Sequence, residues 1–303
     1  MKIRIGSRTS PLALLQTNQV IDAIVKAEPA ARCEIVKIES EGDLNQAPLH
    51  LIGGKGLFVE KLEQSMIAGE TDMAVHSLKD VPAIMSNDFL IVATMQRENA
   101  SDVMLLKDEI CFKDLGEGSK IGTSGPRRKA QLMGLIEGLE IIPIRGNIQT
   151  RIKKIINGEL DGLVMAKAAL NRLQIQHPNT YYFNHKEMLP AAAQGAIGIQ
   201  THAASMSRDL KRILSLINHE ETHLATLLER EVVACLDGGC LSPISVFCEM
   251  NQNAITIQVR VSDQEGVTTI NHAEIFDKSE QNSAMLRIKN YLIESGAKEL
   301  IQK

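Results

Sequence analysis

One cysteine stands in a sequence context suited to covalent chemistry. The run Gly238-Gly239-Cys240-Leu241-Ser242-Pro243 has two glycines before the cysteine and a proline after it. Glycine allows backbone conformations with φ > 0, so such a loop can carry a sulfur atom out into a cleft. The motif alone is weak, because many loops begin with Gly or end with Pro. Its weight comes from the cationic loops elsewhere in the chain.

Arginines with small polar neighbours recur after predicted strands, with almost no acids beside them. The stretches are Gly6-Ser7-Arg8-Thr9-Ser10, Gly122-Thr123-Ser124-Gly125-Pro126-Arg127-Arg128, and Ile144-Arg145-Gly146-Asn147 with Arg151 and Arg172 further along. The N-terminus of a helix, with its bare N–H groups, and the guanidinium fork both suit carboxylates. A single Arg is more often a surface charge, and Ser10 is fully explained as a helix cap. Together with the thiol, the set indicates a covalently held, polyanionic substrate.

Two more stretches carry candidate chemistry. Gly53-Gly54-Lys55-Gly56-Leu57-Phe58 is either a flexible loop that closes over a substrate or a simple turn, and its spacing is not that of a Walker A loop. Thr71–Pro82 is a buried strand that runs into polar residues, and ligands bind at this end of strands in open α/β sheets. Asp80 is the only acid that we expect in the cleft, where it could offset developing positive charge. The alternatives are a solvated turn for Asp80 and a satisfied core histidine for His76.

Composition excludes several classes of function. The chain has 303 residues and a net charge of −4, which favours two or three domains and gives no global attraction to nucleic acid or membranes. Three Tyr, six Phe and no Trp leave few stacking surfaces for single strands. No apolar run approaches the roughly 20 residues of a membrane span, and no signal peptide is expected. Five scattered cysteines favour reduced thiols in the cytoplasm, and they lack zinc-site spacing.

Hydrophobic periodicity predicts an α/β architecture with a largely parallel sheet in each of two halves, followed by a small α+β domain. The predicted strands are 2–5, 34–38, 73–75, 90–94, 120–122, 140–144, 162–165, 196–199, 244–249, 254–261 and 267–275. The predicted helices are 10–26, 57–68, 127–137, 148–157, one within 207–217, 221–234 with Leu224, Leu227, Leu228 and Val232 on one face, and 283–295. Residues 102–118 and 190–194 are interpreted as crossings between the halves. The expected domains are 1–97 with 196–217, then 98–195, and 218–303, which carries the cysteine loop.

The motifs resemble one family. GSRTSPLALLQ, GGKGLF, AVHSLKDVP, GTSGPRRKAQL, RGNIQTR, LPAAAQGAIGI and GGCLSPI are similar, in that order and over essentially the whole chain, to hydroxymethylbilane synthases (porphobilinogen deaminases). The resemblance implies two periplasmic-binding-protein-like α/β domains around a cleft and a monomeric transferase. That enzyme condenses four porphobilinogen molecules into a linear tetrapyrrole and releases ammonia at each condensation. It also implies a dipyrromethane cofactor in thioether linkage to Cys240.

The resemblance further implies roles for individual residues. Asp80 matches the catalytic aspartate, which stabilises the cationic azafulvene-like species left when the substrate loses ammonia. The positions that match cofactor and substrate binding are Arg8, Ser10, Lys55, Phe58, Ser77, Lys79, Thr123, Ser124, Arg127, Arg128, Arg145, Gly146, Arg151, Arg172 and Gln194. No metal is expected.

Some positions depart from the family pattern. Gly125 replaces a serine and so removes a hydroxyl donor, while Ala169, Ala193 and Gln200 replace residues that are usually glycine, glycine and an acid. Leu-Ser-Pro follows Cys240 where Gln-Val-Pro is more usual. These departures leave a divergent paralogue with altered rate or substrate as an alternative. Two further classes stay open: a non-enzymatic anion-binding protein, and a cysteine hydrolase, which would need a histidine beside the thiol.

Overall fold

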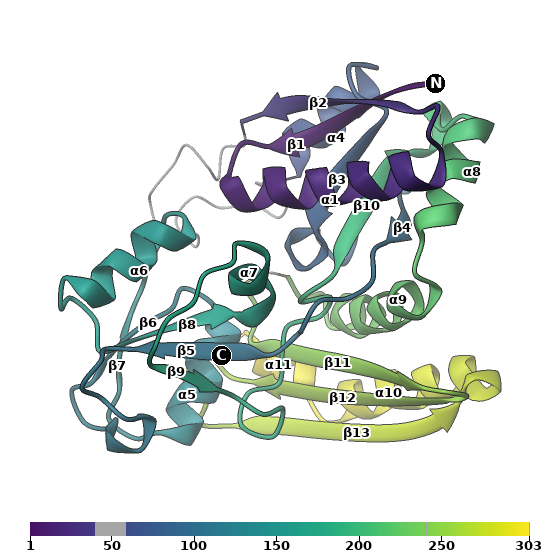
Figure 1. The fold of residues 1–303 in the computed structure, drawn as a ribbon. Helices are drawn as coiled ribbons and strands as arrows, with labels where there is room; N and C mark the ends of the chain where they lie inside the picture. The colour runs from purple at the N-terminus through teal and green to yellow at the C-terminus, as the bar shows by residue number, and fades with distance from the viewer. Residues whose placement is uncertain (40–58, 240, 303) are drawn as a thin grey trace.

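The computed structural model describes residues 1–39, 59–239 and 241–302. The described chain forms two five-stranded sheets and one three-stranded sheet. Figure 1 shows the first sheet in the upper part of the molecule, the second at the lower left and the third at the lower right, with helix α9 (Glu220–Cys235) between the first and third. This arrangement confirms the predicted α/β architecture with a small α+β part at the C-terminus.

The first sheet has the strand order β2-β1-β3-β10-β4. Strand β1 pairs in parallel with β2 and β3, whereas β10 is antiparallel to both β3 and β4. Four of its strands therefore point one way, as predicted, and only β10 opposes them. The bounds are β1 Lys2–Arg8, β2 Arg32–Ile38, β3 Met73–Ser77, β4 Phe89–Thr94 and β10 Ile197–His202.

Local sequence signals explain the helices of this half. Helix α1 begins at Pro11, after Ser10 accepts a 3.3 Å hydrogen bond from the N–H of Ala13, so the predicted cap is confirmed. Gly69 takes φ +68° after α4, as a left-handed helix end requires. The bounds are α1 Pro11–Ala27, α4 Glu60–Ile67, α8 Arg208–Ile217, and the short 3₁₀ turns η1 Leu78–Asp80 and η3 Ala203–Ser205.

The second sheet has the order β7-β6-β8-β5-β9, and again one strand, β5, opposes the other four. The interpretation of residues 102–118 as a crossing is wrong at its start, because Asp102–Leu106 forms β5 and is buried throughout. The strand was not predicted because its first residue, Asp102, is charged. The bounds are β5 Asp102–Leu106, β6 Lys120–Gly122, β7 Glu140–Ile142, β8 Gly162–Ala166, β9 Thr180–Tyr182 (which was not predicted), η2 Phe112–Asp114, α5 Pro126–Leu135, α6 Ile148–Ile156 and α7 Lys167–Arg172.

The chain passes between the two large sheets twice, from β4 to β5 and from β9 to β10, and Figure 1 shows both segments running side by side in front of α9. Hydrogen bonds of 3.1 Å from the N–H of Glu98 to the carbonyl of Gly195, and of 2.8 Å from Arg97 Nε to the carbonyl of Gln194, tie the two segments together. In the described part of the chain, these two segments are the only places where the chain itself passes between the two large sheets.

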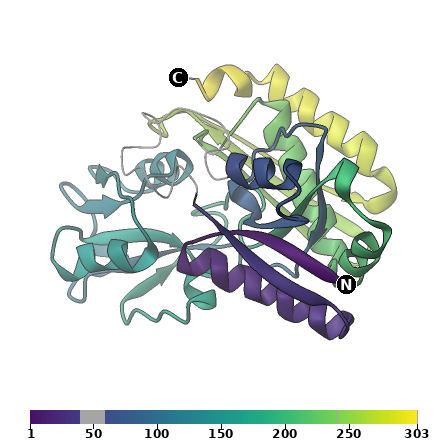
Figure 2. The same ribbon diagram turned by 90° about the horizontal axis from the view of Figure 1, so that it is seen from above.

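The third sheet is antiparallel, in the order β11-β12-β13, as predicted. Its inner face packs on α9 and α10, and Figure 2 shows α10 and α1 on opposite sides of the molecule. Leu228 and Val232 of α9 are buried in this core, but Leu227 is 44% exposed, so its predicted place on the apolar face is wrong. The bounds are β11 Ile244–Asn251, β12 Ala254–Ser262, β13 Thr269–Asp277, η4 Lys278–Glu280, α10 Gln281–Glu294 and α11 Ala297–Leu300. Within the described chain, every helix is too short or too polar to cross a bilayer.

Candidate active site

The turn that carries Lys79 and Asp80 follows directly on β3. Leu78 anchors it with a side chain that is 1% exposed, and its N–H donates to the carbonyl of Ala196 over 3.0 Å. From α9, Arg230 donates to the carbonyls of Val81 (2.8 Å) and Pro82 (2.7 Å). Asp80 is therefore half-buried on a turn that the first sheet and the C-terminal part hold together.

Two arginines at the start of α5 bind a buried acid. Oδ2 of Asp102 lies 2.6 Å from Nη2 of Arg127, while its Oδ1 accepts from Nε (3.1 Å) and Nη2 (2.7 Å) of Arg128. Burial alone would raise the pKa of Asp102, but the neighbouring charges of Arg127, Arg128 and Lys79 outweigh it and hold that pKa well below its usual range. Asp102 is thus a second, fully buried acid near these cations, one that sequence reasoning did not single out.

Gln194 joins this acid to the lysine beside Asp80. Its Nε2 donates to Oδ1 of Asp102 (2.9 Å) and to the carbonyl of Ala100 (2.6 Å), and its Oε1 accepts from Nζ of Lys79 (3.2 Å). Gln194 is fully buried. Burial and the charge of Arg128 lower the pKa of Lys79 to about 8, against the opposing effects of Asp80 and Asp102.

A second pair of cations lies around the start of α6, with Arg145 on the β7–α6 connection and Arg151 within the helix. Arg151 donates through Nε to the carbonyl of Gly146 over 2.8 Å, and Gly146 has φ +101°, a conformation that favours glycine. Burial, Arg128 and Arg145 lower the pKa of Arg151 to about 10, and Asp80 opposes them. Burial and two neighbouring arginines disfavour the charged form of Arg151, and a ligand that carries several carboxylates would offset both effects.

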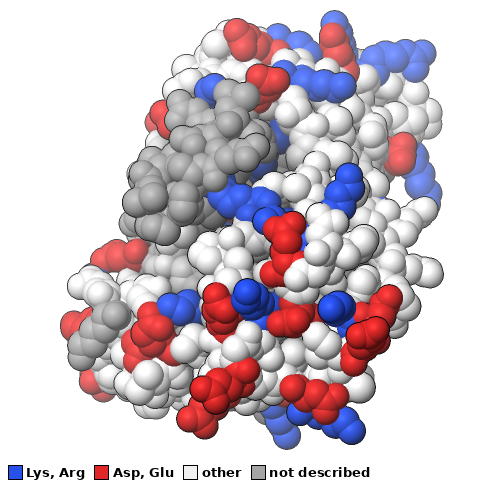
Figure 3. Space-filling model, turned by 90° about the vertical axis from the view of Figure 1, so that its left-hand side faces the viewer, with Lys and Arg blue, Asp and Glu red and all other residues white. Residues whose placement is uncertain are grey.

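Lys and Arg side chains gather near the middle of the face in Figure 3, between the part of the molecule that holds the first sheet and the part that holds the second. Arg8 ends β1 on the first sheet, and its charge contributes to the lowered pKa of His76 on β3. The charges that shift the pKa values of Lys79 and Arg151 come from both halves of the molecule, so the two sheets place these cations and Asp80 within electrostatic reach of one another. The structure thereby brings together Lys79, Asp80, Arg127, Arg128, Arg145 and Arg151.

The chain matches two family models in sequence order. Residues 3–209 match "Porphobilinogen deaminase, dipyromethane cofactor binding domain", and residues 223–289 match "Porphobilinogen deaminase, C-terminal domain". The chain belongs to the porphobilinogen deaminase family. A porphobilinogen deaminase of Campylobacter concisus is 38% identical over 100% of this chain and 98% of its own length. One from Clostridium botulinum strain 657 is 43% identical over 85% of this chain and 88% of its own length.

Solved structures align less closely. The BenM effector binding domain with its effector benzoate gives a TM-score of 0.43 at 17% identity over 71% of this chain and 90% of that chain. A TRAP periplasmic solute binding protein from Desulfovibrio salexigens gives a TM-score of 0.42 at 12% identity over 74% of each chain. The porphobilinogen deaminase assignment rests on the sequence matches and on no structural likeness.

Several predicted binding residues are used to build the loops of the site. Ser124 donates to the carbonyl of Ile144 (2.5 Å) and accepts from its N–H (2.7 Å), so one hydroxyl fixes the β7–α6 loop beside the β6–α5 loop. Ser77 donates to Oε1 of Gln16 on α1 (2.9 Å), and Arg172 donates to the carbonyl of Gly195 (2.7 Å). Thr123 is buried, and its Oγ1 accepts from the N–H of Gly125 (3.3 Å).

Three predicted site residues, Lys55, Phe58 and Cys240, lie outside the described residues. The positions on either side of the cysteine are well defined, since Gly239 donates to Oγ of Ser242 and Ser242 to the carbonyl of Gly239, both over 3.0 Å. A Cβ atom on Gly238 would come within 2.5 Å of Cδ1 of Ile244, so a larger residue would force this side chain to shift. The chain is tied to α9 before the cysteine, where the N–H of Gly238 donates to the carbonyl of Val233 (3.0 Å), and to the third sheet after it, where the N–H of Ser262 donates to the carbonyl of Pro243 (3.1 Å).

His76 is a buried histidine with a hydrogen-bond partner, as the alternative of a satisfied core histidine predicts. Its Nε2 lies 3.0 Å from Oε1 of Gln200. The Nε2 of Gln200 in turn donates to Oε1 of Glu63 over 2.7 Å. Burial is the main cause that lowers the pKa of His76 to about 4. Gln200, one of the departures from the family pattern, is thus fully buried and hydrogen-bonded at both ends of its amide.

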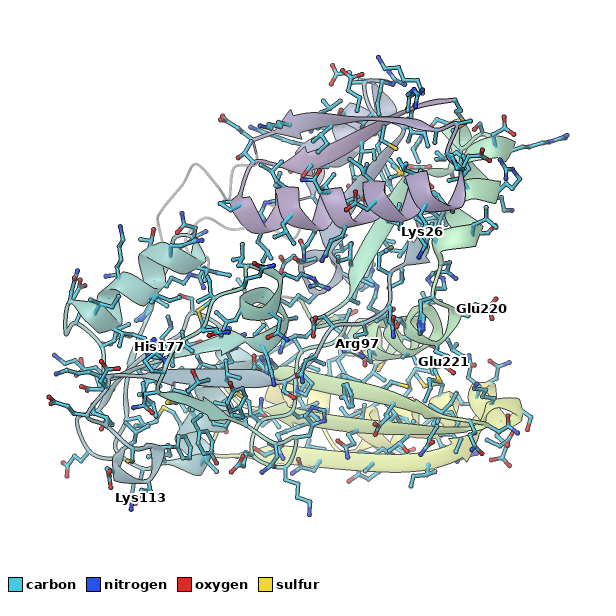
Figure 4. The ribbon with its side chains drawn as sticks, in the orientation of Figure 1. Lys26, Arg97, Lys113, His177, Glu220 and Glu221 are labelled. Atoms are coloured by element: carbon cyan, nitrogen blue, oxygen red, sulfur yellow. The ribbon has the colours of Figure 1, made fainter. Side chains whose placement is uncertain are left out.

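Sequence reasoning missed Arg97, Asp102, Glu229 and Arg230. Arg97 lies where the first crossing passes α9 (Figure 4), and it pairs in bidentate fashion with Glu229 over 2.6 and 3.1 Å. No local motif marks these residues, because their partners are far away in the sequence. Only Asp102 carried a sequence signal, as a charged residue at the start of an otherwise apolar strand. Within the described part of the chain, no cluster of three or more His, Cys, Asp or Glu side chains could hold a metal ion.

Proposed function

We propose that Asp80 and the surrounding cations catalyse the reaction of the porphobilinogen deaminase family, in which four porphobilinogen molecules condense into linear hydroxymethylbilane with release of ammonia. The observation that carries the proposal is the position of one half-buried carboxylate, Asp80, within electrostatic reach of Lys79 and Arg151, which lie on different halves of the molecule. Each porphobilinogen carries two carboxylates and a pyrrole N–H. The cations of the site suit the carboxylates, and the carboxylate of Asp80 suits the pyrrole N–H.

Asp80 acts on the reacting ring. When the aminomethyl group of the substrate loses ammonia, positive charge develops on the pyrrole, and a fixed carboxylate nearby stabilises it. The same carboxylate accepts a hydrogen bond from pyrrole N–H groups and assists proton movement. The bonds from Arg230 to Val81 and Pro82 keep the turn fixed while this happens.

The cations bind acetate and propionate groups. The side chains to which we assign this role are Arg8, Lys79, Arg128, Arg145 and Arg151, with Lys55 and Phe58 on the glycine loop. Ser10, Ser77, Thr123, Ser124, Arg127, Gly146, Arg172 and Gln194 support them by holding the loops, as the contacts above describe. The depressed pKa values of Lys79 and Arg151 support this assignment, because an anionic ligand would relieve the repulsion between these cations.

The dipyrromethane cofactor named in the matched family model fits the same residues, because it too carries several carboxylates. We assign its thioether attachment to Cys240. When bound, it supplies the pyrrole carbon to which the first substrate is joined. The hydrogen bonds between Gly239 and Ser242, described residues on either side of Cys240, support this assignment.

We divide the chain into residues 1–97 with 196–217, residues 98–195, and residues 218–303. The two crossings beside α9 support the first division. We also propose a cytoplasmic monomer that acts on a small molecule and needs no nucleic acid or membrane. The scattered cysteines of the sequence support the compartment.

The test is incubation of the purified protein with porphobilinogen while ammonia and hydroxymethylbilane are quantified. Four ammonia molecules for each tetrapyrrole are expected. Binding of porphobilinogen without ammonia release would instead favour the non-enzymatic anion-binding class.

A further inference from the structure

Asp102 accepts hydrogen bonds from two separate segments, helix α5 and the second crossing. Its carboxylate is completely buried at the start of β5. It accepts from Arg127 (2.6 Å), from two nitrogens of Arg128 (3.1 and 2.7 Å) and from Gln194 (2.9 Å). A buried carboxylate with this many donors is fixed in place, and it fixes its partners in turn.

The contact continues from Asp102 through Gln194 to Lys79. Gln194 receives the Lys79 ammonium on its oxygen (3.2 Å) while its nitrogen donates to Asp102. Among the described residues, the charged groups that influence Lys79 include Arg127 and Arg128 from α5, Asp102 from β5 and Asp80 from its own turn. Of the two acids among them, Asp102 is completely buried, whereas Asp80 is half-buried.

Three cations held together in a half-buried site repel one another, and long side chains lose rotamer entropy when they are fixed. Asp102 offsets both effects at once, since it neutralises part of the charge and sets the orientation of both guanidinium groups. Glu229 provides a contrast within the same chain. It is equally buried and arginine-paired, but its partners are Arg97 and the N–H groups of Ala193 and Cys248.

We propose that Asp102 is a positioning residue which, with Gln194 as its link, keeps Lys79 charged and in place for a substrate carboxylate. The inference rests on the proposed function for the identity of the substrate. It goes beyond that function because it assigns to the buried Asp102 the charge and the position of Lys79. Arg127 then serves the site through Asp102, because its Nη1 and Nη2 are engaged by Leu189 and Asp102 inside the protein.

The first experiment measures the titration of Lys79 directly, without activity. Trace acetylation with acetic anhydride over a range of pH, read by mass spectrometry of the Lys79 peptide, gives its midpoint. The midpoint of the parent protein is expected near 8, the value to which its surroundings lower the pKa of Lys79. In Asp102→Asn it should move about 1 lower, because a stabilising negative charge is gone. The control Asp88→Asn, at an exposed acid just before β4, should leave the midpoint in place, and an unmoved midpoint in Asp102→Asn would overturn the proposal.

A second readout is the KM for porphobilinogen at pH 8. A midpoint lowered by about 1 reduces the charged fraction of Lys79 from about one half to about one tenth, so KM should rise about 5-fold in Asp102→Asn. Lys79→Arg added to Asp102→Asn should remove the pH dependence of this rise, because arginine stays charged. A rise in KM that is the same at pH 6.5 and pH 8 would contradict the link through Lys79.

If Asp102→Asn does not fold, Gln194→Met tests the same link while leaving both arginine pairs with Asp102 intact. It removes the oxygen that accepts from Lys79, so the labelling midpoint should again fall, and an unchanged midpoint would overturn the proposal. Failure of the proposed function is recognised separately. In that case the parent protein would release no ammonia from porphobilinogen, whatever the Lys79 midpoint does.

Discussion

Glu229 accepts a 2.6 Å hydrogen bond from the N–H of Ala193, and Ala193 has φ +58°. The left-handed conformation is unfavourable for alanine. Here it occurs on the second crossing, at a position where the family usually has glycine. The buried carboxylate of Glu229 thus holds the strained residue of one crossing while Arg97 from the other crossing pairs with the same group. The connection between the two halves depends on this carboxylate.

Glu229→Gln should therefore destabilise the protein strongly. It leaves the Arg97 guanidinium, whose side chain is 13% exposed, without its counter-charge. Breaking a buried pair from one side costs roughly 3–5 kcal/mol, so the free energy of unfolding in urea should fall by about that amount. Glu220→Gln, at the exposed start of the same helix, is the control and should cost less than about 1 kcal/mol. Equal losses in the two variants would show that the buried pair adds nothing.

Ala193→Gly tests the strain directly. Glycine removes a left-handed penalty of roughly 1–2 kcal/mol, and it loses roughly 1–2 kcal/mol through greater freedom of the unfolded chain and less buried surface. The net change in unfolding free energy should lie within about 0.5 kcal/mol of zero. Ala196→Gly is the matched control, because Ala196 is 2% exposed in the same cluster and does not have a positive φ. With no strain to relieve, it should cost about 1–2 kcal/mol. A cost for Ala193→Gly as large as for the control would contradict the account.

Acid should destabilise the first half through His76. Its folded pKa of about 4 lies below the ordinary value of 6.5, so between these values the unfolded chain binds the extra proton. Stability is therefore retained above about pH 6.5 and falls as the pH drops toward 4. His76→Gln should flatten this part of the curve when urea unfolding is measured at pH 7 and pH 4.5. If the variant lost as much stability as the parent over this range, His76 would not be the group that titrates.

Ser124→Ala should loosen the site without touching its charges. It removes both hydrogen bonds that join Ser124 to the backbone of Ile144. At roughly 1 kcal/mol for each bond, the free energy of unfolding should fall by about 2 kcal/mol, and the neighbouring Arg145 should bind substrate less well. The measurements are urea unfolding and KM. A lower kcat with unchanged stability and KM would mean that the hydroxyl acts in the chemical step instead.

Asp80→Asn should remove turnover and leave the fold unchanged. The amide keeps the shape of the side chain but cannot offset positive charge, so ammonia release should slow by about 10²–10⁴-fold. Thermal unfolding and cofactor content should match the parent. Asp88→Asn, at an exposed acid just before β4, is the control and should keep full activity. Turnover by Asp80→Asn close to that of the parent would remove Asp80 from the mechanism.

Local order was predictable because its causes are local. Ser10 with Pro11, and Gly69 after α4, are chemical signals that lie within one turn of the helix ends they mark. The start of β5 was missed because Asp102, a charged residue, begins a strand that is otherwise apolar. Its charge is tolerated only through partners 25, 26 and 92 residues away. Such tertiary compensation leaves no periodic signal in the sequence.

For the site too, contacts between residues that are distant in the sequence could not be predicted. Chemistry-bearing residues after strands could be located from the sequence, and the structure gathers Lys79, Asp80, Arg128 and Arg151 within electrostatic reach. What could not be predicted is which of them contact the protein itself. Ser124 and Gln194 have the residue types of ligand contacts, but in the fold they tie one loop or side chain to another.

The measurement that tests the account most directly is the intact mass of the purified protein and of Cys240→Ser. The account predicts an excess over the sequence mass equal to two linked porphobilinogen-derived units in the parent protein and no excess in the variant. A parent protein of bare sequence mass that gains nothing on incubation with porphobilinogen would contradict it.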